Sequence, residues 1–134
     1  MSKAVTAKGL NLPISTKDTI EISNAIRGKP VARAKAILND VISEKVPIKY
    51  RRFTNGVGHK PGIGSGRCPV NASKSILKIL NSAEANAQVA GLDVKMLIIQ
   101  AIIPNRASRG YHFGRHRGMQ TKSTNVEIVL GEKQ

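Results

Sequence analysis

Residues 104–122, PNRASRGYHFGRHRGMQTK, separate two strand-like stretches of the chain. The apolar run 94–103 precedes them, and an alternating segment with Val126, Ile128 and Leu130 follows. A period of two is typical of a half-buried strand, and two such segments around a glycine-containing connection favour an antiparallel hairpin. We therefore expect an extended β-hairpin whose tip protrudes on the order of 25 Å, since a strand rises about 3.3 Å per residue.

The tip of this predicted hairpin is cationic and has no carboxylate. Its basic residues are Arg106, Arg109, Arg115, Arg117 and Lys122. The aromatic and imidazole side chains between them are Tyr111, His112, Phe113 and His116. A loop of unpaired cations adds nothing to the stability of a soluble domain, so the pattern indicates a polyanionic partner.

Positive charge is concentrated in two segments. The 134 residues have a formal net charge of +14. Residues 48–68 and 104–122 each contain five Lys or Arg and no Asp or Glu, so together they supply +10 of this charge. Such blocks are typical of nucleic-acid-binding segments.

Length and cysteine content limit the protein class. A chain of 134 residues fits one domain, with a globular core at about 1–47, 69–103 and 121–134, a basic loop at 48–68 and a hairpin tip at 104–120. The single Cys68 excludes an internal disulfide framework and fits a reducing compartment. The N-terminus lacks a secretory apolar region, and no run reaches the roughly 18 apolar residues of a membrane span. We expect a soluble intracellular protein with no membrane partner.

The rest of the sequence predicts three amphipathic helices and a short strand. Ser15 is the expected N-cap of a helix over 16–27, and Gly28 and Pro30 end it. Helical periodicity continues over 31–44 and again from Pro69 to about residue 90. Residues 3–8 alternate weakly and predict an edge strand. The expected fold is α+β, with three helices packed on a small antiparallel sheet that carries the long protruding β-hairpin.

Residues 47–66 show no apolar period and contain five glycines. A loop of this length inside a compact domain is uncommon unless it is functional or disordered. Together with Arg67 it forms a second basic patch, which consists of Lys49, Tyr50, Arg51, Arg52, His59, Lys60 and Arg67. Its glycines allow backbone amides to approach phosphates closely.

Several segments resemble one protein family in the same order along the chain. They are LPIS, IRGKPVARAKAIL, KSILKILNSAEANA, the GLDV segment and TKSTNVEIVL, spanning about Leu12 to Leu130. This pattern resembles the L-twenty-two family of large-ribosomal-subunit proteins. The basic insert 49–67 and the tip sequence SRGYHFGRHRG resemble its archaeal and eukaryotic branch. The bacterial branch lacks a counterpart of the insert, and the residues before Leu12 carry no family signal.

The resemblance implies a structural role on the cytoplasmic ribosome. It implies a globular domain near the outer mouth of the peptide exit tunnel and a hairpin at about Val94–Leu130, whose tip, 108–118, lines the tunnel wall. The implied partners are large-subunit rRNA, neighbouring large-subunit proteins and the nascent polypeptide. We expect no homo-oligomer.

The chemistry of each side chain indicates how it would contact RNA. Planar guanidinium pairs bidentately with phosphate and stacks on unpaired bases, and four of the five cations in 104–122 are arginine. Tyr111, His112 and Phe113 are candidates to stack on splayed bases. The residues Arg27, Lys29 and Arg33 around the RGKP turn either meet RNA or coat a helix junction, and the sequence favours neither reading.

The sequence gives little support for a nucleotide-binding loop, a zinc site or a catalytic site. GIGSGR at 62–67 lacks the Gly-Lys-Ser/Thr ending of a phosphate-binding loop. His59, Cys68, His112 and His116 fall short of a structural zinc set because only one of them is cysteine. No carboxylate falls in either basic loop, so we expect no catalytic residues, no metal and no cofactor. The rival hypotheses are a free-standing nucleic-acid-packaging protein and an RNA-processing enzyme that uses His112, His116 and Lys122.

Overall fold

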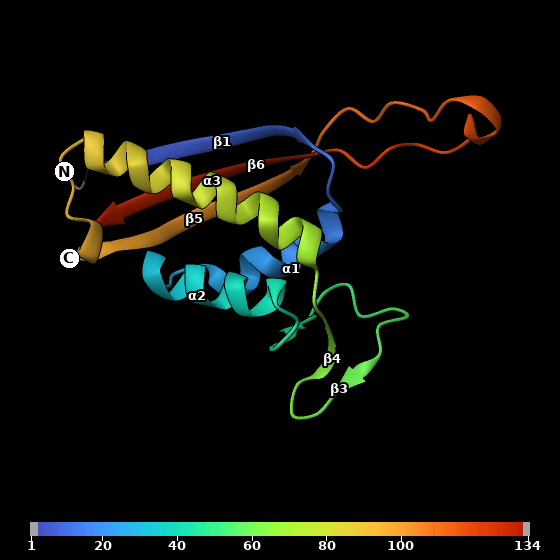
Figure 1. The fold of residues 1–134 in the computed structure, drawn as a ribbon, viewed down its shortest axis with the longest axis horizontal. Coiled ribbons are helices and arrows are strands. Elements are labelled where there is room, and N and C mark those ends of the chain that lie inside the picture. Colours follow the sequence, from blue (N-terminus) through green and yellow to red (C-terminus); the bar gives the residue numbers. More distant parts are fainter. Residues whose placement is uncertain (1–2, 133–134) are drawn as a thin grey trace.

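A three-stranded antiparallel sheet is the framework of the molecule (Figure 1). The computed structural model describes residues 3–132. The strands are β1 (Ala4–Leu12), β5 (Leu97–Arg106) and β6 (Thr124–Glu132), in the spatial order β1-β6-β5. The last strand in sequence is therefore central, and it pairs with the hairpin partner β5 on one side and with the N-terminal strand on the other. The predicted edge strand is confirmed and extends to Leu12.

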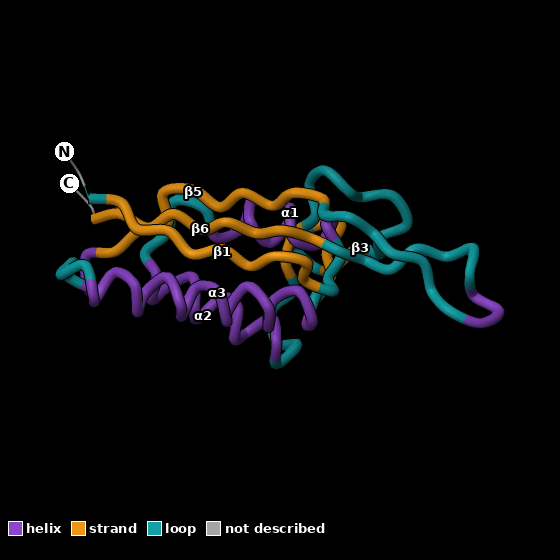
Figure 2. The backbone as a smooth tube through the Cα atoms, turned by 90° about the horizontal axis from the view of Figure 1, so that it is seen from above, coloured by secondary structure: helices purple, strands orange, loops and turns teal. Residues whose placement is uncertain are grey.

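Three helices cover one face of this sheet. They are α1 (Thr16–Ile26), α2 (Val31–Ile42) and α3 (Val70–Val89). Helix α3 packs over β1 and β6, α1 packs against β5, and α2 packs against α3. Figure 2 shows α2 and α3 lying along the same side of the strands. The predicted α+β class, with three helices on a small antiparallel sheet, is confirmed.

The core between helices and sheet is aliphatic. The inward side chains of β6 are Val126, Ile128 and Leu130, and each is at most 1% exposed. The predicted apolar stripe of α3 is buried, and its members are Ala72, Ile76, Ile79, Leu80, Ala83 and Ala87. At about 25 cal/mol per Å² of apolar surface, this burial supplies the main stabilisation of the fold.

Helix boundaries follow the predicted signals. The Ser15 hydroxyl accepts the Asp18 N–H at 3.4 Å, as expected of an N-cap. Gly28 has φ +74°, a left-handed conformation that lets the chain leave α1 and enter the turn before α2.

The predicted basic loop 48–68 contains secondary structure that the sequence did not indicate. A second three-stranded sheet is formed by β2 (Ile48–Lys49), β3 (His59–Lys60) and β4 (Gly64–Arg67), in the order β2-β4-β3. These strands are too short to show alternation, and β4 is half glycine. Eight residues of this segment thus lie in short strands, and the rest of it is turns and loops.

The hairpin arms are paired only as far as Arg106 and Thr124. The 3₁₀ turn η1 (Val94–Met96) precedes β5, so the strand begins three residues later than predicted. The tip contains a single bridge, between Tyr111 and Gln120, and the 3₁₀ turn η2 (Gly114–His116). The predicted hairpin is thus regular in its arms and irregular in its tip.

Ser73 gives a stability prediction. Its hydroxyl on α3 is fully buried and has no hydrogen-bond partner among the residues that the structure describes. Ser73→Ala should raise the free energy of unfolding by about 1 kcal/mol, because it removes an unsatisfied buried group and improves helix propensity. Chemical denaturation measures this change.

Ser23→Ala is the matched control, because the equally buried Ser23 hydroxyl donates to the Thr19 carbonyl at 2.7 Å. Ser23→Ala gains the same helix propensity as Ser73→Ala, but it also removes a hydrogen bond that the wild-type protein makes. Equal effects of the two substitutions would contradict the explanation from the unpaired hydroxyl.

Candidate nucleic-acid interface

Both basic segments lie at the same end of the long axis of the molecule. Figures 1 and 2 show the hairpin tip projecting beyond the end of the main sheet, with the small sheet of residues 48–67 displaced toward the same end. The opposite end holds the start of β5 and the end of α3. The strongest positive charge of the chain is therefore concentrated at one end of the molecule.

The tip is held as a hairpin by main-chain hydrogen bonds beyond the ladder. The Ala107 N–H donates to Ser123 at 3.1 Å, the Thr121 N–H to Gly110 at 2.8 Å, and the His112 N–H to the Met119 carbonyl at 2.9 Å. Gly114 turns the chain with φ +65°. These bonds keep the two sides of the tip together although regular strand pairing has ended.

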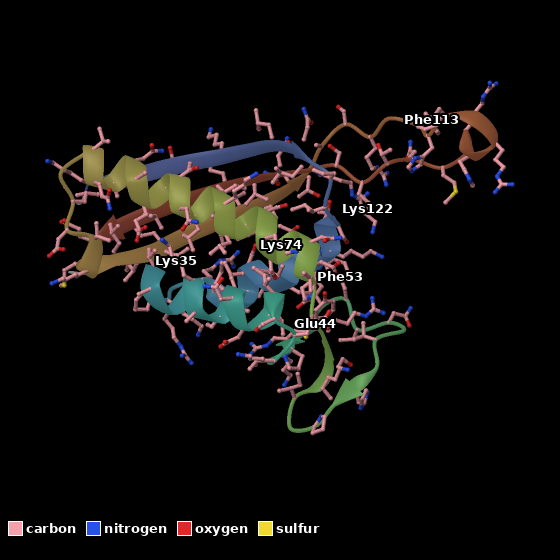
Figure 3. All side chains as sticks on the ribbon, in the orientation of Figure 1. Lys35, Glu44, Phe53, Lys74, Phe113 and Lys122 are labelled. Atoms are coloured by element: carbon pink, nitrogen blue, oxygen red, sulfur yellow. The ribbon has the colours of Figure 1, made fainter. Side chains whose placement is uncertain are left out.

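Aromatic side chains at the tip face solvent. Phe113 is 91% exposed and Tyr111 67%, and Figure 3 shows Phe113 far from the helices. His112 and His116 are exposed as well. Large apolar rings at such exposure gain nothing from the fold, and they suit stacking on unpaired bases.

The cations of the tip have no acidic partners. The ion pairs among residues 3–132 are Lys8–Glu127 and Lys35–Glu84, and both lie away from the tip. The predicted contacts Arg106, Arg109, Arg115, Arg117 and Lys122 are all exposed. Their charge is therefore available to an external anion.

Glu21 of α1 organises the second basic segment, and sequence reasoning missed it. Its side chain is 1% exposed. The carboxylate accepts the N–H of Arg51 at 3.0 Å, of Arg52 at 2.9 Å and of Phe53 at 3.0 Å. The only available signal was an acid within the apolar part of a predicted helix. These bonds fix the backbone of the segment and leave the Arg51 and Arg52 side chains exposed.

Burial by itself would raise the pKa of Glu21. The three backbone N–H donors and the charge of Arg51 outweigh this effect, so the pKa lies below its usual value. Glu21 is therefore ionised at neutral pH and holds the basic segment as a carboxylate.

Tyr50 is buried beneath this surface. Its side chain is 3% exposed, and its O–H donates to Asp18 Oδ1 at 2.6 Å. Burial and the Asp18 carboxylate raise the pKa of this phenol far above its usual value. The ring belongs to the core of this structure and is not free to stack on a base, and RNA contact by Tyr50 stays a prediction.

Phe53 is the aromatic residue that the basic segment does present. Figure 3 labels Phe53 near the start of the small sheet. The centroid of its ring lies 5.1 Å from the guanidinium carbon of Arg52 and 5.7 Å from Lys17 Nζ. Sequence reasoning did not include it among the contacts. Two cations over one half-buried ring form a compact basic and aromatic cluster.

The remaining members of the basic patch lie on the small sheet. Lys49, His59, Lys60 and Arg67 are all exposed. Arg67 donates from Nη2 to the Gly56 carbonyl at 3.0 Å, so this side chain also links β4 to the turn at Gly56. Its role in RNA contact stays a prediction, as do those of the other three.

The RGKP turn extends the edge of the main sheet. The Gly28 N–H donates to Ile99 at 2.9 Å, and the Ile99 N–H donates to Lys29 at 3.0 Å. Arg27 donates from Nη2 to the Ile102 carbonyl at 3.1 Å. These contacts favour the junction-coating reading for Arg27, whereas Arg33 is exposed and its RNA contact stays a prediction.

Metal-binding and membrane-spanning features are absent from residues 3–132. Within that range no three His, Cys, Asp or Glu side chains gather closely enough to hold a metal ion. None of the helices there has the length and apolar character needed to cross a bilayer.

Sequence comparisons match most of this chain. The family model described as ribosomal protein L22p/L17e matches residues 7–131. Large ribosomal subunit protein uL22 of Methanosphaera stadtmanae is 41% identical, covering 97% of this chain and 90% of that protein. The uL22 protein of Thermoplasma acidophilum is 37% identical, covering 89% of this chain and 82% of that protein. The uL22 protein of Zea mays is 36% identical, covering 99% of this chain and 84% of that protein. The chain therefore belongs to the ribosomal protein L22p/L17e family, as the resemblance of its motifs indicated.

Proposed function

We propose that this protein is a structural constituent of the large ribosomal subunit that binds and organises large-subunit rRNA. The observation that carries the proposal is the projecting tip, where five cations have no acidic partner and two aromatic rings face solvent. Family membership supplies the class of particle. The role is that of a scaffold in translation on cytoplasmic ribosomes, not of an enzyme.

The proposed mechanism is charge neutralisation combined with shape. Arg and Lys side chains of the tip and of the small sheet contact phosphates, and such contacts position a protein on RNA without reading its sequence. Phe113 and Tyr111 stack on bases that are not paired. The main-chain bonds of the tip and the Glu21 carboxylate hold these groups in place before RNA arrives.

The hairpin formed by residues 94–130 reaches inward in this proposal, and the tip at 108–118 lines the peptide exit tunnel beside the nascent polypeptide. The globular core, at about 1–47, 69–103 and 121–134 of a single domain, lies near the tunnel exit and meets neighbouring large-subunit proteins. The proposal rests on family membership and on the projection of the tip from the globular part (Figure 1). The protein acts as one copy, not as a homo-oligomer.

Sedimentation of cell extracts tests the ribosomal assignment. The full chain should migrate with large subunits and with complete ribosomes, and should leave the light fractions as assembly proceeds. A protein that remains in light fractions bound to other nucleic acid would instead be a free-standing packaging protein. RNA cleavage that disappears in His112→Ala and His116→Ala would also contradict the scaffold role.

A further inference from the structure

The first two turns of α1 contact the base of the tip as well as the second basic segment. At the start of the helix, the Thr16 hydroxyl lies 2.8 Å from the Thr124 hydroxyl, and Thr124 Oγ1 donates to the Ile14 carbonyl at 2.9 Å. Thr124 is buried, and it is the first residue of β6 after the tip. The base of the tip is therefore fixed to the start of α1.

The next residues of α1 hold the second basic segment. The Tyr50 O–H donates to Asp18 Oδ1 at 2.6 Å, and the three residues after Tyr50 donate their N–H groups to Glu21. Because Asp18 and Glu21 are three residues apart, they lie on the same face of α1. The two carboxylates thus hold residues 50–53 against the helix that also anchors the tip.

Tyr50 joins the small sheet to α1 through one side chain. Its main-chain N–H donates to the Ser65 carbonyl of β4 at 2.9 Å, while its ring reaches the Asp18 carboxylate. Burial of the ring is favourable but non-directional, so burial alone does not select one orientation of the sheet. A hydrogen bond has a preferred distance and angle, and the bond from the phenol to Asp18 therefore sets the angle between the small sheet and α1.

We propose that Tyr50 is a positioning residue, which holds the small sheet at one angle to the tip so that both basic segments contact one RNA surface together. Groups that already have their bound geometry avoid an ordering cost on binding. Once one segment has bound, the other then contacts the RNA at a high effective concentration. The inference rests on the proposed function and adds to it a fixed geometry between the two segments.

A double-mutant cycle on the affinity of the full chain for a large-subunit rRNA fragment tests this role. Tyr50→Phe keeps the ring and removes only the hydroxyl, and it should lower affinity roughly tenfold, a usual size for coupling between two sites. In a background with Lys49, Arg52 and Lys60 replaced by Gln, the same substitution should change affinity by less than about twofold, as independent effects do. Equal losses in both backgrounds, or no loss in either, would overturn the positioning role.

Two substitutions of Asp18 separate the hydrogen bond from charge, because both remove the same carboxylate. The amide oxygen in Asp18→Asn still accepts the Tyr50 O–H, whereas Asp18→Ala offers no acceptor. Asp18→Asn should therefore bind the rRNA fragment more tightly than Asp18→Ala, by roughly fivefold, the low end of such coupling. Equal affinities of the two variants would show that the bond does not position the small sheet.

A distance measurement without RNA gives an independent readout. Spin labels at His59→Cys on the small sheet and Asn105→Cys near the base of the tip, with Cys68→Ala, report the spacing of the two segments by pulsed electron paramagnetic resonance. Adding Tyr50→Phe should broaden or shift the distance distribution. The core substitution Ile128→Val, a control for lost stability, should leave the distribution and the RNA affinity unchanged.

The outcomes distinguish this inference from the proposed function. A distribution that Tyr50→Phe leaves unchanged, or that Ile128→Val broadens equally, would overturn the positioning role while RNA binding by the wild type still stands. Failure of the wild type to bind the rRNA fragment would contradict the proposed function itself, and the inference would fall with it.

Discussion

Glu21→Gln should lower the free energy of unfolding by about 3 kcal/mol and release the basic segment from α1. The carboxylate accepts three backbone N–H groups, with Oε1 taking Arg52 and Phe53 and Oε2 taking Arg51. An amide keeps one acceptor oxygen and turns an NH₂ group toward the remaining N–H. Hydrogen bonds to a buried charged group contribute about 1.5–3 kcal/mol each and are not additive here, because they share one acceptor group.

Denaturant unfolding at pH 7 and amide exchange at residues 51–53 measure this effect. Glu84→Gln is the control, because it removes a carboxylate from the partly exposed pair with Lys35 and should cost under about 1 kcal/mol. Rapid exchange at 51–53 with an intact core is the expected signature. A loss below about 0.5 kcal/mol, or exchange equal to that of the wild type, would show that Glu21 does not hold the segment.

The effect of Glu21 should depend on pH in a defined direction. The folded pKa lies below the usual carboxyl value, because the backbone donors outweigh the opposing effect of burial. Its stabilisation is therefore complete above the unfolded pKa, at about 4.3, and is lost as pH falls through the lower folded pKa. Wild type and Glu21→Gln should differ most near neutrality and converge in acid.

Local signals in the sequence predicted most of the helical layer and the hairpin arms. The stripe of α3 and the Ser15 cap depend on neighbours within four residues, and both were predicted correctly. The alternation at Val126, Ile128 and Leu130 likewise placed the last strand correctly. Its central position in the sheet was not predictable in this way, because pairing between β1 and β6 joins residues more than one hundred positions apart.

The sequence predicted which segments carry the basic residues of the candidate site, but it predicted only part of how those residues are packed and held. Charge counts identified both basic segments because charge is a property of the sequence itself. The burial of Tyr50 and the role of Glu21 depend on which face of α1 meets which part of 48–68, and no periodicity encodes that contact. Tyr50 was therefore included among the predicted RNA contacts although its ring is buried in the core, and Phe53 was not included.

Neutralising four cations of the tip should reduce RNA affinity roughly a thousandfold at 0.1 M salt. The variant combines Arg109→Gln, Arg115→Gln, Arg117→Gln and Lys122→Gln. Each phosphate contact contributes about 0.7–0.9 to the slope of log affinity against log salt, so four contacts contribute about three. A slope of three between 0.1 M and 1 M salt corresponds to about three powers of ten in affinity.

The matched control removes four exposed lysines outside both basic segments: Lys45, Lys74, Lys78 and Lys95, each replaced by Gln. Both variants have a net charge four units lower than the +14 of the wild type. Binding to a large-subunit rRNA fragment, measured across a salt series, should lose about three units of slope in the tip variant alone, because the tip cations contact phosphate in the proposed complex and the four replaced lysines do not. Equal losses in the two variants would mean that affinity follows net charge alone. The projecting tip would then be an ordinary charged surface, and the proposal that it positions RNA would fail.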